Sequence, residues 1–356
     1  MQLREGILPG VKCTNKINRK RTVPIHRNIC KRKAAAVTLG IVTAVCVLAG
    51  CGSKAPDDSY QIYTSSAKAG LIAPVDAAPA SSLFATDLCV GGTENSDDTA
   101  RAVDTAETAG VFDLTRQKIN FAKNLYERRH PASTTKILTA YLALKYGDPD
   151  DIVTVSSTAA AIPSDSSVCG LKVGDRISLK NLLYGLMICS GNDAANAIAE
   201  HISGSTSAFA ELMNEEAKKL GATTSHFLNA HGYPEDNHYT TAYDLYLIFS
   251  AAIRDETFKE IISHGTVDVT YENAAGEPVN AKWENTDWFM TGAASLPSGF
   301  TPLGGKTGSA DSSGYCLVLY SERDDGTELL SVILKSVEKP ALYQGMRQML
   351  DAYGKE

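Results

Sequence analysis

The sequence predicts an α+β fold in which a helical segment separates two strand-rich segments. The chain of 356 residues has an ordinary globular composition, with 44% hydrophobic and 21% charged residues. Short runs rich in apolar residues suggest strands before and after a long stretch whose apolar residues recur at helical spacing. No internal repeat is found, and strands and helices do not alternate as they would around a parallel sheet.

The first fifty residues differ in charge from the rest of the chain. They contain ten Lys or Arg residues and one acidic residue, a balance of +9, and end in an apolar run and the string Leu48-Ala49-Gly50-Cys51. This order is typical of a secretory signal, and LAGC resembles a bacterial lipobox. We therefore expect residues 1–50 to be a lipoprotein signal peptide and Cys51 to carry lipid at the extracytoplasmic face of the bacterial cell membrane. A plain transmembrane anchor, the alternative, predicts the same side of the membrane.

Residues 51–82 are rich in Ser, Ala, Pro, Gly and Asp and predict a flexible tether. Residues 83–356 are expected to form one domain. Beyond residue 50 the chain has 24 basic and 40 acidic residues, a balance of −16. An acidic balance argues against a dedicated nucleic-acid binder, and eight cysteines are too few for a disulfide scaffold.

The domain begins with strand signals. Residues 83–92 are briefly apolar and predict a first strand, and residues 94–108 predict an acidic loop. Residues 109–114 and 118–122 flank a short polar turn and predict a hairpin.

The middle of the domain is predicted to be helical, because its apolar residues recur at helical spacing and Gly or polar residues separate the stretches. The predicted helices cover residues 133–146, 179–188, 193–202, 207–220 and 241–253.

The last part returns to strands. We predict hairpins formed by residues 266–271 with 278–283 and by residues 314–322 with 328–335, followed by a closing helix over residues 340–353.

Three short strings carry side chains suited to chemistry. They are Ser133-Thr134-Thr135-Lys136, Ser190-Gly191-Asn192 and Lys306-Thr307-Gly308. Together they match the S-x-x-K, S-D-N and K-T-G set of penicillin-binding proteins and class A β-lactamases. A further S-x-x-K, at Ser65–Lys68, lies in the tether and is interpreted as chance.

Ser133 and Lys136 are the candidate nucleophile and base. Residues three apart share one face of a helix, so the lysine can stand beside the Ser133 hydroxyl. A lysine acts as a base only when its pKa falls, and burial or a neighbouring cation lowers it. Lys306 is the expected neighbouring cation.

The other strings supply candidate proton-relay and substrate-binding groups. Ser190 is a candidate to relay a proton to the leaving amine, and Asn192 to hold a substrate amide. On an edge strand, Lys306 and Gly308 point to one face and Thr307 to the other.

The third string suits a carboxylate and a substrate backbone. Lys306 offers a charge and Thr307 a hydrogen bond to the carboxylate, and Gly308 leaves room for the substrate. The backbone N–H groups of Ser133 and Ser309 are candidates to stabilise an oxyanion.

From about residue 102 onward the chain resembles the serine D-Ala-D-Ala carboxypeptidases, the low-molecular-mass penicillin-binding proteins. Five blocks carry the resemblance in order: PASTTKILTAYLAL (131–144), GLMICSGNDA (185–194), NAHG (229–232), HYTTAYDL (238–245) and GKTGSADSSGYCLV (305–318). The resemblance implies a β-lactamase/transpeptidase-like fold. This fold has an antiparallel five-stranded sheet flanked by helices, together with an all-helical subdomain.

The resemblance also implies a reaction. Ser133 attacks the carbonyl between two D-alanines of a peptidoglycan stem peptide, Lys136 takes its proton, the terminal D-Ala leaves, and water hydrolyses the acyl-enzyme. β-Lactams are expected to acylate the same serine. No cofactor, metal or nucleic acid is expected, and the membrane is expected to be a partner through the lipid on Cys51.

Two alternatives share the three strings. A class A β-lactamase needs a Glu that drives water onto the acyl-enzyme. Glu211 and Asn214 have E-x-x-N spacing but are interpreted as part of a solvated helix face. The other alternative is a lipoprotein that binds stem peptides or β-lactams without turnover; the presence of both Ser133 and Lys136 argues against it.

A zinc peptidase is a third alternative, but its candidate ligands match no metal motif. These ligands are His226, His231 and His238. Cys189 lies beside Ser190 and is expected to be sensitive to oxidation. No disulfide pairing follows from the spacing of the cysteines beyond Cys51, which are Cys89, Cys169, Cys189 and Cys316.

Overall fold

The structure, a computed structural model, describes residues 87–96 and 103–355. The predicted signal peptide, the lipidation site at Cys51 and the tether lie outside the described residues. Within the described ranges, no helix combines the length and the apolar character needed to cross a bilayer.

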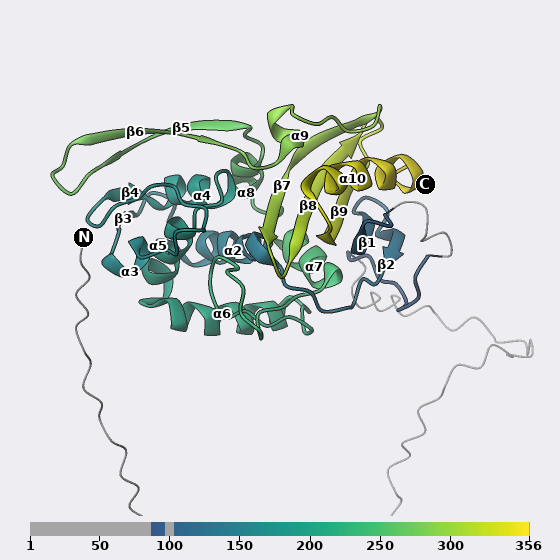
Figure 1. The fold of residues 1–356 in the computed structure, drawn as a ribbon, viewed down its shortest axis with the longest axis horizontal. Helices are drawn as coiled ribbons and strands as arrows, with labels where there is room; N and C mark the ends of the chain where they lie inside the picture. The colour runs from purple at the N-terminus through teal and green to yellow at the C-terminus, as the bar shows by residue number, and fades with distance from the viewer. Residues whose placement is uncertain (1–86, 97–102, 356) are drawn as a thin grey trace, which may run out of the picture. The chain divides into compact units, whose positions relative to one another are not determined.

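A five-stranded sheet lies in the C-terminal unit, with the strand order β2-β1-β9-β8-β7 and antiparallel neighbours throughout (Figure 1). Its strands are β1 (Ala106–Asp113), β2 (Lys118–Lys123), β7 (Phe300–Ala310), β8 (Gly314–Arg323) and β9 (Glu328–Ser336). Helices and the four strands of a second sheet occupy the chain between β2 and β7, so the predicted α+β class is confirmed, as is the five-stranded antiparallel sheet.

Both faces of this sheet are covered by helices. Leu317 and Leu319 of β8 pack in a cluster with residues of α10 (Lys339–Tyr353). The alternate residues Cys316 and Val318 belong to the cluster on the helical side. Successive side chains in a strand point to opposite faces of the sheet. A sheet with helices on both faces therefore needs apolar residues at nearly every position of its central strands.

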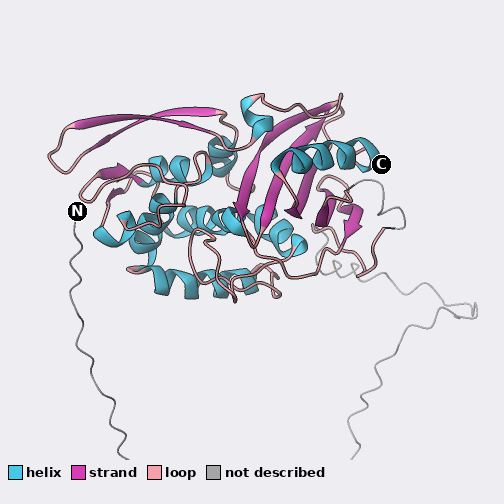
Figure 2. Cartoon of the chain, viewed as in Figure 1, coloured by secondary structure: helices cyan, strands magenta, loops and turns pink. Residues whose placement is uncertain are grey.

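The helical part surrounds one central helix, α2 (Lys136–Tyr146), which is preceded by a short 3₁₀ turn, η1 (Ala132–Thr135). Figure 2 shows the helices gathered beside the sheet. The other helices here are α3 (Ser157–Ala160), α4 (Leu179–Met187), α5 (Asn192–Ser203), α6 (Thr206–Lys219), α7 (Ala242–Ala252) and α8 (Glu256–Ile262).

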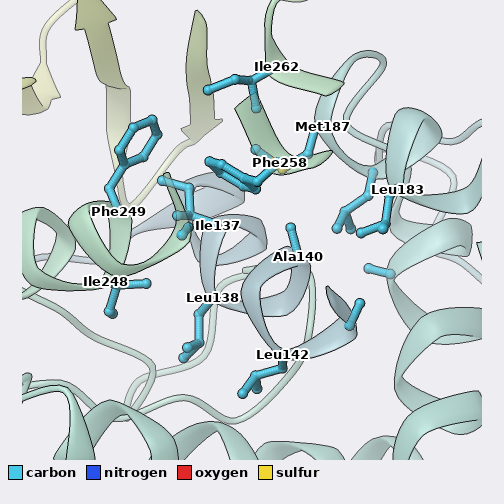
Figure 3. Packing of buried hydrophobic residues seen from close by; sticks show 14 of the residues in the cluster. Ile137, Leu138, Ala140, Leu142, Leu183, Met187, Ile248, Phe249, Phe258 and Ile262 are labelled. Carbon is cyan, nitrogen blue, oxygen red and sulfur yellow. The ribbon is translucent and has the colours of Figure 1, made fainter. Parts of the chain in front are cut away.

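The body of α2 is buried on nearly all sides. Figure 3 shows Leu138 of α2 toward Ile248, with Phe249 and Phe258 on the side toward Ile137 and Leu142 one turn further along the helix. A helix that is apolar nearly all round belongs in the interior of a domain. This packing fixes the position of the residues at its N-terminal end.

A second sheet has the order β3-β4-β5-β6. Its long hairpin, β5 (Thr266–Glu272) with β6 (Pro278–Glu284), is close to the predicted one, whereas β3 (Ile152–Thr154) and β4 (Arg176–Ser178) were not predicted. These two strands have three residues each, too few to show a two-residue period. The short helix α9 (Trp288–Thr291) was also missed.

The prediction of a strand over residues 83–92 is wrong where the structure describes it, from residue 87 onward. The Cys89 N–H donates to the Tyr246 hydroxyl, and the Cys89 carbonyl accepts from the Tyr243 hydroxyl. Side chains thus satisfy backbone groups that a strand would pair with a neighbouring strand. The predicted helix over 133–146 is correct apart from its first turn, which is η1.

Candidate functional site

The three motif strings come from distant parts of the chain and meet at one cavity. Ser133 lies in η1, Ser190 in the turn between α4 and α5, and Lys306 on the edge strand β7. The cavity has a volume of about 140 Å³. It is lined by Ser133, Ser167, Ser190, Thr286, Thr307, Gly308, Ser309, Tyr315, Cys316, Lys339 and Leu342.

A larger hollow of about 630 Å³ lies beside α9 and α10. It contains none of the residues of the three motifs. The motif residues, and not the size of the cavity, therefore identify the candidate active site, which is the smaller cavity.

Lys136 is fully buried and makes three hydrogen bonds through its Nζ. The Nζ lies 2.9 Å from Ser133 Oγ, 2.7 Å from Asn192 Oδ1 and 2.9 Å from the backbone oxygen of His231. The last two oxygens only accept hydrogen bonds. In a neutral lysine they take both N–H groups and leave the nitrogen lone pair facing Ser133 Oγ, which is the geometry of a general base.

The surroundings of Lys136 favour its neutral form. Burial lowers the pKa of Lys136 well below its ordinary value, and the nearby charge of Lys306 lowers it further. Both causes were expected from the sequence. A lowered pKa makes the neutral amine, the form that takes a proton from Ser133, easier to reach.

The turn that carries Ser133 is held by a close backbone approach. Gly232 has a φ of +85°, and a Cβ at this position would lie 1.8 Å from the Ala132 oxygen. Ala132 itself has a φ of +47°, which is unusual for a residue with a side chain. The segment containing Gly232 thus packs directly on the nucleophile turn and presents the His231 carbonyl to Lys136.

Ser190 occupies a strained turn and contacts the second cavity lysine. Its φ is +62°, and its side chain is only 3% exposed. Lys306 Nζ donates to Ser190 Oγ at 3.0 Å and to the Thr307 backbone oxygen at 3.0 Å. Burial lowers the pKa of Lys306 to about 7, so this lysine changes charge within the physiological pH range.

The register of β7 places its side chains as the sequence predicts. Lys306 and Gly308 pair with Val318 and Cys316, which face the helical side, whereas Thr307 pairs with Leu317 on the other face. A Cβ on Gly308 would lie 2.9 Å from the Ser133 backbone nitrogen. The absent side chain lets the edge strand approach the nucleophile, and Ser309 lines the same cavity.

Asn192 makes a contact that was not expected from the sequence. Its Oδ1 is engaged by Lys136. Its Nδ2 has no hydrogen-bond partner among the described residues and remains able to donate to a substrate carbonyl.

Three residues near the cavity were not found from the sequence. Thr286 exchanges a hydrogen bond with the Thr307 hydroxyl. Lys339, at the start of α10, lines the cavity, and burial lowers its pKa. Asp287 is buried. No motif marks these residues, since they come from segments outside the three strings.

Asp287 brings a negative charge close to the cavity lysines. Burial raises its pKa to about 6, while the charges of Lys306 and Lys339 lower it. Its Oδ1 caps α9 by accepting from the Phe289 N–H at 2.9 Å. The Asp287 carboxylate in turn raises the pKa of both Lys306 and Lys339.

The structure does not place the β-lactamase candidate residues at the cavity. No acidic side chain lines the cavity in the described part of the chain. Glu211 is exposed on α6. Asn214 bonds the backbone of Ala210 and Phe227, so it serves to hold local structure.

The histidines of the zinc alternative do not gather around a metal site. Residues 87–96 and 103–355 contain no group of three or more potential metal ligands. His238 bonds Thr135 Oγ1 through its Nε2 and accepts from the Leu228 N–H. Burial lowers the pKa of both His231 and His238 to about 3, which keeps them neutral.

Comparison with known proteins identifies relatives of this site and fold. Residues 95–337 match the sequence profile of the Peptidase S11 family, described as D-alanyl-D-alanine carboxypeptidase. The D-alanyl-D-alanine carboxypeptidase DacD of Escherichia coli is 32% identical over 253 residues, which cover 67% of this chain and 61% of that protein. DacF of Bacillus subtilis, another D-alanyl-D-alanine carboxypeptidase, is 31% identical over 251 residues, covering 69% of this chain and 61% of that protein.

A solved structure gives the same result. The crystal structure of the Streptomyces K15 DD-transpeptidase superimposes with a TM-score of 0.65 and 27% identity over 71% of this chain and 98% of that chain. The chain therefore spans about three fifths of the two curated carboxypeptidases and nearly all of this solved chain. The expected transpeptidase-like fold is confirmed.

Proposed function

The chain belongs to the D-alanyl-D-alanine carboxypeptidase family, Peptidase S11, and we propose that it removes the terminal D-alanine from peptidoglycan stem peptides. One observation carries the proposal: the buried Lys136 Nζ lies 2.9 Å from Ser133 Oγ, and its other two contacts are acceptors. This is an activated nucleophile of the kind that forms covalent acyl-enzymes.

The first half of the reaction forms an ester on Ser133. Its Oγ attacks the carbonyl carbon of the penultimate D-alanine, and Lys136 takes the hydroxyl proton. The developing oxyanion faces the backbone N–H groups of Ser133 and Ser309. The C–N bond then breaks, and the proton held by Lys136 passes through Ser190, which contacts Lys306, to the nitrogen of the leaving D-alanine, so that Lys136 is neutral again.

The second half releases the shortened peptide. A water gives its proton to Lys136 and attacks the ester carbonyl, and Ser133 regains its proton as the ester breaks. The terminal carboxylate of the substrate pairs with Lys306 and Thr307, and the half-buried Lys339 adds positive charge to the same cavity. The acidic chain thus offers a carboxylate a local cationic pocket.

β-Lactams are proposed to acylate Ser133 by the same attack, with slow release. The absence of an acidic side chain from the described lining of the cavity supports slow release. A residue able to activate water as a class A β-lactamase glutamate does is missing there.

We further propose that lipid on Cys51 anchors the enzyme at the extracytoplasmic face of the membrane. The basic segment, the apolar run and LAGC support this proposal. Feeding cells an alkyne fatty acid should label the wild-type protein and leave Cys51→Ala unlabelled. Equal labelling of both proteins would contradict the lipid site.

The activity is tested by D-alanine release from a peptide ending in D-Ala-D-Ala. Wild type should release D-alanine, whereas Ser133→Ala should not. Ser65→Ala is the matched control, because it removes the serine of the other S-x-x-K and should leave release unchanged. No release by wild type would favour a non-catalytic binding protein, and fast multiple turnover of nitrocefin would favour a β-lactamase.

A further inference from the structure

Two cysteines meet beside the catalytic turn. Cys169 Sγ lies 3.2 Å from Cys189 Sγ, and Cys189 directly precedes Ser190. A disulfide needs the two sulfurs at about 2.05 Å, so a movement of about 1 Å would bring them to bonding distance. Both cysteines retain partial exposure, whereas Cys89 and Cys316 are buried.

The Cys169 sulfur fits into a slot made by two glycines. A Cβ on Gly185 would lie 2.5 Å from this sulfur, and one on Gly191 would lie 2.2 Å from it. Real Cβ atoms do not approach that closely. The slot therefore exists only because both positions are glycine, and one of them is the central residue of the Ser190-Gly191-Asn192 string.

The backbone around Cys169 is already held in place. Its N–H donates to Asp193 Oδ1 at 2.8 Å, and its carbonyl accepts from the Trp283 indole at 3.3 Å. The Asn192 N–H donates to the Ser167 carbonyl at 2.8 Å. These bonds bind residues 162–171, here called the rim segment, to the turn that carries Ser190. Bond formation therefore requires movement of the sulfurs more than of the backbone.

We propose that Cys169 and Cys189 form a reversible disulfide that joins the rim segment to the catalytic turn. The geometry favours this pair over the other described thiols. Cys89 and Cys316, by contrast, are enclosed in the core.

The chemistry is an exchange with a small-molecule disulfide such as oxidised glutathione. The Cys189 thiolate attacks one sulfur of that disulfide, a mixed disulfide forms, and one glutathione thiolate leaves. The Cys169 thiolate then attacks the Cys189 sulfur and expels the second glutathione thiolate. The two protons of the cysteines end on the two glutathione thiols, and the small-molecule disulfide is the oxidant.

The order of attack follows from the surroundings of the two thiols. Burial raises the pKa of Cys169 well above its ordinary value, and the adjacent Cys189 and Asp193 raise it further. Cys169 is therefore the thiol that reacts second. An oxidising extracytoplasmic setting, as proposed for this enzyme, is where such a bond persists.

The bond closes a loop of about twenty residues in the chain. Loop closure of this length constrains the unfolded chain, so the oxidised protein should unfold at a temperature roughly 5–10 °C higher than the reduced protein. Since the backbone near Ser190 is already held, both forms should acylate Ser133 at rates within about twofold.

The test treats the purified full chain with oxidised glutathione or with dithiothreitol, alkylates it, and maps its peptides by mass. We expect a Cys169–Cys189 cross-linked peptide only after oxidation, together with the higher unfolding temperature. Cys89 serves as an internal control and should be alkylated only after unfolding. In Cys169→Ser, Cys189 should carry a glutathione adduct, and the oxidant should not raise the unfolding temperature.

Two results would overturn the inference. One is free Cys169 and Cys189 after oxidation, and the other is separate glutathione adducts on both without a cross-link. Labelling with a fluorescent penicillin keeps the proposed function separate, because the activity is not needed for the cross-link. A cross-link without labelling would contradict the function alone, and labelling without a cross-link would contradict the disulfide alone.

Discussion

The helical stretch from residue 132 to residue 146 uses burial in opposite ways at its polar end, residues 132–136, and along the buried part that follows, residues 137–143, here called the apolar end. At the N-terminal end, Lys136 is buried as a polar group and keeps three hydrogen bonds. Further along, Ile137, Leu138 and Leu142 are buried in an apolar cluster. Burying an amine is unfavourable, whereas burying a leucine stabilises the fold. The burial of Lys136 is unfavourable in free energy, but it lowers the pKa of this base. The packing of the apolar end stabilises the helix that holds Lys136 in its buried position.

This contrast predicts that changes at the polar end lower activity far more than stability. Replacing the base, in Lys136→Met, should lower the rate of acylation by a fluorescent penicillin by about 10²–10⁴-fold. The free energy of unfolding should change by less than about 2 kcal/mol, because relief of amine burial offsets the lost hydrogen bonds. Stopped labelling assays and thermal unfolding measure the two effects. Unfolding of the variant at room temperature would show that Lys136 is a structural residue.

The apolar end should behave in the reverse manner. Leu142→Ala should lower the free energy of unfolding by about 2–5 kcal/mol, because it leaves a cavity in a fully buried cluster. Well below the unfolding transition, its acylation rate should stay within about twofold of wild type. Urea unfolding gives the first quantity, and labelling kinetics gives the second. A large loss of acylation rate in folded Leu142→Ala would contradict the expectation that the apolar end affects stability and not activity.

Gly232 packs on the polar end, where a Cβ would lie 1.8 Å from the Ala132 oxygen. Gly232→Ala should lower the acylation rate by about 10–100-fold, since a displaced His231 carbonyl would no longer orient Lys136. Gly204→Ala is the matched control, because Gly204 also has a left-handed φ but nothing lies near its missing Cβ. The control should lose only about 1 kcal/mol of stability. Equal acylation rates in the two variants would contradict the role of the contact.

The smallest effect concerns pH. The folded-state pKa of Lys306 is depressed to about 7 by burial, so its positive charge is present below pH 7 and is lost as pH rises through that value. For a substrate with a terminal carboxylate, kcat/KM should therefore fall above pH 7 by up to tenfold per pH unit. The same peptide with a terminal amide should lack this alkaline decline. Identical profiles for the two peptides would show that Lys306 does not bind the carboxylate.

Residue spacing was enough to predict much of the site. Ser133 and Lys136 are three residues apart, so helical geometry places their side chains on one face. Lys306 and Gly308 are two residues apart, so strand geometry does the same for them. The contact of Lys136 with the His231 carbonyl was not predictable, because a backbone oxygen has no residue signature. The approach of Cys169 to Cys189 depends likewise on two loops meeting in space.

In the fold, too, local sequence patterns predicted some elements and missed those that depend on distant contacts. Long apolar patterns predicted the central helix and the hairpins of both sheets, since their periods extend over many residues. The strand expected at residues 83–92 was wrong, because the backbone of Cys89 bonds two tyrosine hydroxyls and not a neighbouring strand. The conformation of such a segment depends on side-chain partners that lie more than a hundred residues away in the chain.

In the proposed reaction, Ser133, activated by Lys136, is the nucleophile. The most direct test is to treat the full chain with benzylpenicillin, digest it, and locate the covalent adduct by mass spectrometry. We expect one penicilloyl adduct, on the peptide that contains Ser133, and none in Ser133→Ala. An adduct on Ser190 or Ser65, or an adduct that persists in Ser133→Ala, would contradict it.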